Sequence, residues 1–188
     1  MKYAALFVRE DSGYKNRPEW DAYDAGRDAT TYIGNLPVVA HPPCRAWGQL
    51  SHMANPRQGE KELAFFAIEQ VRRCGGILEH PSGSRLFKTH LPSSGQFPDE
   101  YGYTILIDQF DFGHVAHKPT KLYICGVSNE DLPPMPAKRT ESTDRSICGN
   151  VLGTKRCTQY QREYTPEKLM DWFELVLDKI GVDNNNCP

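Results

Sequence analysis

Apolar positions fall into short runs separated by polar segments that contain many prolines and glycines. Runs of aliphatic and aromatic residues predict strands over residues 3–8, 38–40, 76–81, 103–109 and 121–126. Two longer stretches carry apolar residues at helical spacing and predict helices over 60–73 and 165–180. Residues 19–32, which are rich in Asp, Ala and Tyr, are expected to form a short helix or an irregular segment.

The order of these elements predicts an α/β fold with a mostly parallel sheet. The strand at 38–40, the helix at 60–73 and the strand at 76–81 form a βαβ unit, in which the carboxyl ends of both strands reach the same edge. The 110–120 segment between the last two strands is too short for a crossover helix. These two strands are therefore expected to form an antiparallel pair at the edge of the sheet.

Composition indicates one soluble domain. The chain has 188 residues and a net charge of −2, so it has no overall basic character that would favour non-specific nucleic-acid binding. We expect a single domain over 1–182 with a basic loop insertion at about 127–163, followed by a flexible tail at 183–188. No apolar run is long enough for a membrane span, and six cysteines without a CxxC pair indicate reduced thiols in the cytoplasm. Composition leaves the oligomeric state open.

A cysteine stands where chemistry is expected. Two prolines end the 38–40 strand, since neither can donate to a sheet, and Cys44 follows at once. Open α/β sheets bind ligands at the carboxyl ends of their strands. Taken alone, this stretch fits a nucleophile and a small buried cysteine equally well. Glu79, near the end of the next predicted strand, favours the nucleophile, because a thiolate can add to C6 of a pyrimidine while a carboxylic acid binds the ring at N3.

The ordered motifs resemble those of short phage-type proteins related to cytosine-5 DNA methyltransferases. Residues 41–44 (His-Pro-Pro-Cys) are similar to their Pro-Pro-Cys element, and residues 78–81 (Leu-Glu-His-Pro) to their Glu-(Asn/His)-Pro element. Residues 109–123 match a Gln-x-x-Phe-Gly…Lys-x-Thr-x-Leu-(Trp/Tyr) pattern, and a Thr-Pro helix closes the chain. The resemblance therefore covers residues 37–180.

The resemblance implies a compact Rossmann-like methyltransferase-type sheet with helices on both faces, in an enzyme that modifies C5 of a pyrimidine in DNA or in a nucleotide. Cys44 would be the nucleophile and Glu79 the ring-binding acid, with S-adenosylmethionine as the methyl donor. A target base in duplex DNA would have to be flipped out of the stack. Further contacts to the substrate or nucleic acid would come from Arg45, His80, Gln109, His114 and Lys118.

The sequence departs from that family after the first predicted strand. The usual Phe-x-Gly-x-Gly loop, which holds S-adenosylmethionine, is replaced by residues 9–14 (Arg-Glu-Asp-Ser-Gly-Tyr), which contain one glycine. The stretch before the Pro-Pro-Cys element is also shorter than in that family. Asp24 or Asp28 would then supply the acidic group that binds the ribose of the cofactor.

Two other functions fit the same residues. A relative that keeps the fold would bind DNA or a protein partner without catalysis, and the short amino-terminal region favours it. A metal-dependent hydrolase or nuclease would use His41, His80 and His114 with nearby aspartates. No paired Cys/His spacing of the structural zinc type is present, so no metal ligand is assigned. The basic residues of 138–162 fit a patch that tracks phosphates and a solvated loop equally well.

Overall fold

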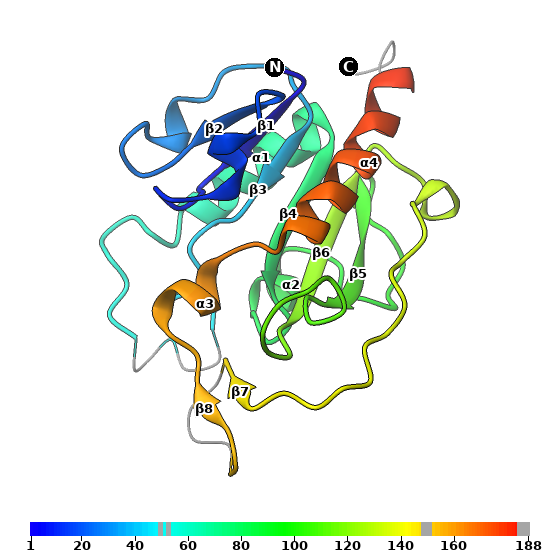
Figure 1. Cartoon of the computed structure of the whole chain (residues 1–188). Coiled ribbons are helices and arrows are strands. Elements are labelled where there is room, and N and C mark those ends of the chain that lie inside the picture. Colours follow the sequence, from blue (N-terminus) through cyan, green and yellow to red (C-terminus); the bar gives the residue numbers. More distant parts are fainter. Residues whose placement is uncertain (49–50, 52–53, 148–151, 184–188) are drawn as a thin grey trace.

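The computed structural model describes residues 1–48, 51, 54–147 and 152–183, and Figure 1 shows the chain folded around one main sheet. Within these residues the strands of the main sheet are β1 (Tyr3–Leu6), β2 (Trp20–Tyr23), β3 (Val38–Ala40), β4 (Gly76–Pro81), β5 (Gly102–Asp108) and β6 (Pro119–Cys125). The α-helices are α1 (Leu63–Cys74), α2 (Leu86–Thr89), α3 (Gln159–Glu163) and α4 (Glu167–Asp183). Smaller elements are the strand pair β7 (Arg145–Ser146) and β8 (Lys155–Arg156) and the 3-10 helices η1 (Gly13–Asn16), η2 (Ala29–Thr31) and η3 (Asn129–Asp131).

The main sheet has the strand order β2-β1-β3-β4-β6-β5. Strands β1 to β4 are parallel, whereas β6 runs antiparallel to both of its neighbours, β4 and β5. The prediction of a mostly parallel α/β sheet that ends in an antiparallel pair is therefore confirmed. The connection from β5 to β6 covers only residues 109–118, which is too short for the crossover that a parallel pair needs.

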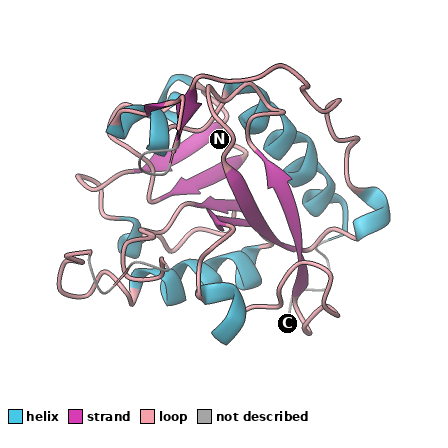
Figure 2. Cartoon of the chain, turned by 90° about the horizontal axis from the view of Figure 1, so that it is seen from below, coloured by secondary structure: helices cyan, strands magenta, loops and turns pink. Residues whose placement is uncertain are grey.

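Helices cover both faces of the sheet, with α1 on one side and α4 on the other (Figures 1 and 2). Successive residues of a strand point to opposite faces. Ala40 and Leu78 accordingly pack in the cluster that contains α1, while Val39 and Ile77 pack in the cluster that contains α4. Because both faces are buried, these strands are continuous apolar runs without polar alternation, which makes them easy to recognise in the sequence.

Two glycines allow β4 to follow α1 directly. Gly75 lies just after the helix with a φ of 73°, and a Cβ there would lie 2.6 Å from Cγ2 of Ile180 on α4. At Gly76 a Cβ would lie 1.9 Å from the carbonyl oxygen of Val38, because β3 and β4 pair at this point. A side chain here would push apart the two strands whose carboxyl ends carry the candidate site.

The prediction for residues 19–32 was wrong at its start, where the edge strand β2 pairs with β1. Trp20 anchors this strand, because its ring packs on Tyr3 at 4.9 Å and on Tyr14 at 4.6 Å between ring centroids. The residues that follow are only half-buried, and Asp21 forms an ion pair with a nearby arginine. A sheet edge tolerates such polar residues, so the apolar run that identifies the central strands is missing here.

Two parts of the segment expected as a basic loop insertion, 127–163, contact the connection between β5 and β6 through Arg139 and Gln161. Arg139 donates to the carbonyl oxygens of Phe110 (2.9 Å) and His114 (3.1 Å), and its guanidinium lies over the ring of Phe110. Later in the segment, α3 begins with a capping box. The side chain of Thr158 accepts from the backbone N–H of Gln161, and the side chain of Gln161 accepts from the backbone N–H of Thr158. Part of the positive charge of this segment is therefore engaged within the protein.

Two further expectations concern the tail and the membrane. The expected tail at 183–188 lies outside the described residues apart from Asp183. Among the residues that the structure describes, no helix is both long and apolar enough to cross a membrane.

Candidate functional site

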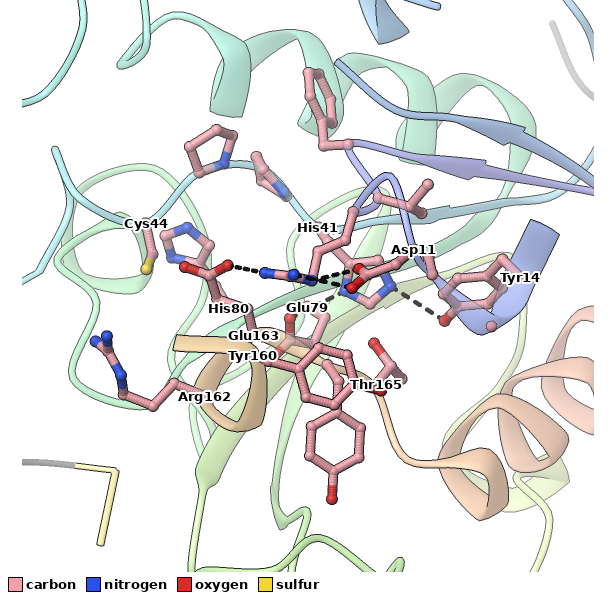
Figure 3. A pocket seen from close by; sticks show the side chains of 18 of the residues that line it. Asp11, Tyr14, His41, Cys44, Glu79, His80, Tyr160, Arg162, Glu163 and Thr165 are labelled. Carbon is pink, nitrogen blue, oxygen red and sulfur yellow. Dashed lines mark hydrogen bonds and ion pairs between the residues drawn. The ribbon is translucent and has the colours of Figure 1, made fainter. Parts of the chain in front are cut away.

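A pocket of about 600 Å³ opens at the carboxyl ends of β1, β3 and β4. Its lining comes from the loops after β1 and β3, from the end of β4, from Lys118 just before β6, from residues 159–165, which include α3, and from the start of α4. Figure 3 shows Cys44, His41 and Glu79 around this pocket, with Tyr14 from η1 nearby. The thiol and the carboxylate that the sequence placed at neighbouring strand ends thus line one cavity.

Cys44 reaches this pocket because β3 ends abruptly. The backbone N–H of His41 still donates to the carbonyl oxygen of Leu6 (3.0 Å), but two prolines follow and cannot extend the ladder. Cys44 is exposed to solvent through the pocket, although protein atoms surround much of its thiol. Burial and the negative charge of Glu79 raise the pKa of this thiol, and the positive charge of Lys118 opposes them. Cys44 is therefore mainly a protonated thiol at neutral pH.

Glu79 enters the pocket as an anion held by two donors. Nδ1 of His41 lies 3.1 Å from its Oε2, and Nε2 of Gln109 donates to its Oε1 at 3.0 Å. Burial alone would raise the pKa of Glu79, but the hydrogen bond from His41 and the charge of Lys118 outweigh it and lower the pKa to about 2. An ionised carboxylate accepts hydrogen bonds and cannot donate them, so this group favours ligands that present N–H groups.

A buried tyrosine extends this hydrogen-bonded chain. The hydroxyl of Tyr14 lies 3.1 Å from Nε2 of His41. Because Nδ1 of His41 faces the carboxylate of Glu79, we assign the ring proton to Nδ1, so that Tyr14 donates to Nε2. Tyr14 is fully buried, and burial raises its pKa well above the usual value, which keeps the hydroxyl protonated. No sequence pattern identifies Tyr14, whose position depends on packing against Trp20 of the unexpected strand β2.

Gln109 lies behind Glu79 rather than in the pocket. Its side chain is buried, it does not line the cavity, and its Nε2 also donates to Oγ1 of Thr120 at 3.0 Å. Its Oε1 has no hydrogen-bond partner among the described residues. The structure therefore gives Gln109 a different place from the expected substrate contact, one from which it orients the carboxylate.

Three other residues expected at the substrate line the pocket, namely His80, Arg45 and Lys118. Burial lowers the pKa of His80 to about 4, so its ring is neutral, and among the described residues neither ring nitrogen has a well-formed hydrogen bond. Arg45 binds Oε1 of Glu60 through Nε (2.9 Å) and Nη2 (2.7 Å), and half of its side chain is exposed. Nζ of Lys118 donates to the carbonyl oxygen of Tyr164 at 3.3 Å.

His114 does not line the pocket, so the structure offers no basis for the expected contact with substrate. This side chain is fully buried, with Nδ1 2.8 Å from the carbonyl oxygen of Ala116 and Nε2 2.6 Å from that of Gln161. Its ring also stacks on Tyr164 at 4.8 Å. His114 instead ties the connection between β5 and β6 to α3, and so supports the segment that completes the pocket.

The acids expected at a cofactor ribose, Asp24 and Asp28, do not line the pocket either. Oδ1 of Asp24 accepts from the backbone N–H groups two and three residues further on, at 2.9 Å each, and its Oδ2 forms an ion pair with Lys15. Asp28 caps η2 by accepting from the backbone N–H of Thr30 at 3.0 Å. Both carboxylates therefore stabilise their own turns.

The loop after β1, which would hold the methionine part of S-adenosylmethionine, is also occupied by internal contacts. Arg9 pairs with Asp11 (2.8 Å) and with Glu163, which links this loop to α3. The glycine of this loop, Gly13, provides no cradle, because a Cβ there would lie 2.7 Å from Cε of Met170 on α4. The residues present do not fit this cofactor in the way that the resemblance implies.

Comparisons with known proteins do not assign this chain to a family. A scan against models of protein families finds no match. A search of curated proteins finds no match either. The geometry of the pocket is therefore the basis on which a function can be proposed.

The expected metal-binding alternative gains no support from this geometry. In the part of the chain that the structure describes, no group of three or more His, Cys, Asp or Glu side chains is arranged to hold a metal ion. His41 is bound to Glu79 and Tyr14, and His114 lies outside the pocket. Of the three histidines that the sequence offered as ligands, His41 and His80 line the pocket and His114 does not.

Proposed function

We propose that this pocket binds a pyrimidine, in DNA or as a nucleotide, and that Cys44 adds to C6 of the ring. The supporting observation is that Cys44 and Glu79 line one pocket, with the carboxylate already held by hydrogen bonds. The parallel pairing of β3 with β4, in which Val39 lies opposite Ile77, sets the spacing of the two groups. This arrangement is similar to the one implied by the resemblance to cytosine-5 DNA methyltransferases.

Glu79 would bind and activate the ring. As an acceptor it suits the exocyclic amino group of cytosine and the N3–H of an N3-protonated cytosine or of uracil. A negative charge beside N3 stabilises the protonated ring, which withdraws electrons from C6 and favours attack there. His41 and Gln109 hold the carboxylate in place, so little reorganisation is needed when the ring binds.

Cys44 would supply the electrons for the covalent step. The thiol loses its proton to water, and the resulting thiolate forms the S–C6 bond. The electron pair of the C5–C6 double bond moves into the ring, which makes C5 nucleophilic. C5 then takes an electrophile, or a proton from water. Water removes the original C5 proton while the S–C6 bond breaks, which restores the double bond and returns Cys44 as a thiolate. When C5 has taken a proton from water, this cycle exchanges the hydrogen at C5 with solvent.

Hydrogen exchange at C5 tests this proposal without a methyl donor. The protein is incubated in D₂O with single-stranded and duplex oligonucleotides, dCMP and dUMP, and deuterium at C5 is measured by mass spectrometry. We expect exchange on at least one substrate, and none with Cys44→Ser, whose weaker nucleophile is a matched control. Absence of exchange on every substrate at pH 7 to 9 would contradict the proposal. A second series with S-adenosylmethionine asks separately whether a methyl group is transferred.

A second candidate is a protein that binds DNA or a partner without catalysis. It is favoured by the raised pKa of Cys44 and by the internal pairing of Arg9 in the loop after β1. For this candidate we expect oligonucleotide binding that is unchanged in Cys44→Ala, together with no exchange at C5 in the unmodified protein. Fluorescence anisotropy with a labelled oligonucleotide measures the binding.

A further inference from the structure

Lys118, the last residue before β6, brings a positive charge into the pocket. Its backbone is fixed, because its N–H donates to Oδ1 of Asp108 (2.8 Å). Its carbonyl oxygen accepts from the N–H of Gln109 (3.2 Å) and from the hydroxyl of Thr120 (2.9 Å). The direction from which this side chain enters the pocket is therefore set by the same connection that orients Glu79 through Gln109.

The ammonium group of Lys118 has few partners. Its hydrogen bond to the carbonyl oxygen of Tyr164 is long, at 3.3 Å, and it forms no ion pair with a described carboxylate within 4.0 Å. An ammonium has three N–H donors, so two remain available to the pocket. Burial lowers the pKa of Lys118, which reflects the cost of holding this charge away from water without a counter-ion in contact. Charges held at such cost are concentrated at functional sites.

The groups that act electrostatically on Lys118 come from three elements. Glu79 lies on β4, Cys44 follows β3 and Glu163 ends α3, and each of them raises the pKa of Lys118 against the effect of burial. The coupling is mutual, because Lys118 in turn lowers the pKa of Cys44 and of Glu79. Cys44 is the group among these three whose charge must appear during the proposed reaction.

Several other positive groups that line the pocket are engaged or neutral, whereas Arg162 also lines it and its Nε has no hydrogen-bond partner among the described residues. Arg45 is paired with Glu60, and half of its side chain is in solvent. Arg9 is shared between two carboxylates in the loop after β1 and α3. The ring of His80 is uncharged at neutral pH. Lys118 lines the same pocket as Cys44, has one long hydrogen bond and lowers the pKa of Cys44, so its charge can balance a negative charge on sulfur.

We propose that Lys118 activates Cys44: its ammonium stabilises the thiolate that burial and Glu79 disfavour, and it keeps its own proton while doing so. This inference rests on the proposed function, in which Cys44 is the nucleophile. The S–H proton leaves to water, the thiolate lies beside the ammonium, and the sulfur electrons then form the bond to C6. Lys118 acts through Cys44 and is a positioning residue in this reaction.

The rate of alkylation of Cys44 by iodoacetamide tests this role, because iodoacetamide reacts with the thiolate. The alkylation rate is measured as a function of pH, and peptide mass spectrometry identifies Cys44 as the alkylated residue. Lys118→Met removes the charge and keeps the length, and we expect its profile to move to higher pH with an alkylation rate about tenfold lower at pH 8, which corresponds to one pKa unit. Lys118→Arg keeps the charge, and its alkylation rate at pH 8 should stay within about twofold of that of the unmodified protein. Glu79→Gln should move the profile to lower pH.

An unchanged profile in Lys118→Met, or a shift to lower pH, would overturn the proposal. Thermal unfolding shows whether the variants are folded, and Lys118→Gln provides a second neutral replacement with the same expected shift. Because alkylation needs no pyrimidine, its outcome is separate from that of the C5 exchange. If the alkylation profile shifts in Lys118→Met but no substrate exchanges hydrogen at C5, Lys118 activates Cys44 and the proposed function is contradicted. If C5 exchange occurs and the alkylation profile is unchanged, the proposed function is supported and the role of Lys118 is contradicted.

Discussion

The two halves of the pocket use their polar groups in opposite ways. At the ends of β3 and β4, Cys44 faces the cavity and Lys118 has one long hydrogen bond and no described ion pair. At the end of β1, Arg9, Asp11 and Glu163 neutralise one another. Unpaired polar groups in a partly buried site cost stability, whereas paired ones connect elements. The first half therefore offers polar groups to the ligand that we propose, and the second half joins the loop after β1 to α3.

Replacing the thiol of Cys44 should change C5 exchange more than any other substitution in the pocket. We expect Cys44→Ala to abolish C5 hydrogen exchange, because Cys44 is the only thiol among the described residues that line the pocket. Its melting temperature should change little, since Cys44 is exposed and its side chain is small. Deuterium incorporation and thermal unfolding are measured on the same preparation, and residual exchange above one-hundredth of the original rate would place the nucleophile elsewhere.

Removing the charge of Glu79 should separate ring activation from thiol reactivity. We expect Glu79→Gln to slow C5 exchange by roughly 100-fold, because the amide no longer stabilises a protonated ring. Alkylation of Cys44 should become faster at the same time, since a negative charge beside the thiol is lost. Asp11→Asn, which removes a carboxylate from the other half, should leave exchange within about twofold. Equal effects of the two substitutions would contradict the division of the pocket.

These two groups also show how far the sequence alone could reach. The strands that carry Cys44 and Glu79 were recognisable because both of their faces are buried and their apolar runs are continuous. The edge strand β2 was not recognisable from the sequence. The position of Tyr14 behind His41 depends on this strand, so it could not be predicted either. Spacing could show that Gln109 and His114 belong near the sheet edge, but side-chain direction decides which residues enter the pocket. For both, that direction points into the protein.

The neutral His80 should give the site a measurable acid sensitivity. Burial lowers its pKa from 6.5 to about 4, so the unfolded chain binds this proton first as the pH falls. The stability that depends on neutral His80 is complete above pH 6.5 and is lost as the pH falls from 6.5 to 4, by up to roughly 3 kcal/mol. The corresponding contribution of Glu79, whose pKa is lowered from 4.5 to about 2, is lost only below pH 4.5.

Urea unfolding at pH 7.5, 6 and 5 measures this loss for the unmodified protein and for His80→Gln. The variant removes the titrating ring, so its free energy of unfolding should depend less steeply on pH over this range. If the two proteins show the same slope, His80 is not the group that makes this half of the pocket sensitive to acid.

The smallest effect is expected at the other half. Arg9→Gln removes ion pairs of a partly exposed side chain, and such pairs contribute about 0–1 kcal/mol to stability. The rate of C5 exchange should stay within about twofold of that of the unmodified protein.

Isothermal calorimetry with S-adenosylmethionine should give no heat of binding for the unmodified protein, because Asp24 and the loop after β1 are engaged internally. Binding in the micromolar range would show that this half also meets a ligand.

Covalent capture by 5-azacytosine tests the central claim most directly. Addition of a thiolate to C6 of this base leaves a nitrogen at position 5, which takes a proton from water and needs no methyl donor. We expect an oligonucleotide that contains 5-aza-2′-deoxycytidine to give a protein–DNA adduct on a denaturing gel, with the modified peptide containing Cys44. The adduct should be absent with Cys44→Ala. An oligonucleotide that binds without forming an adduct, or an adduct on another cysteine, would contradict the account.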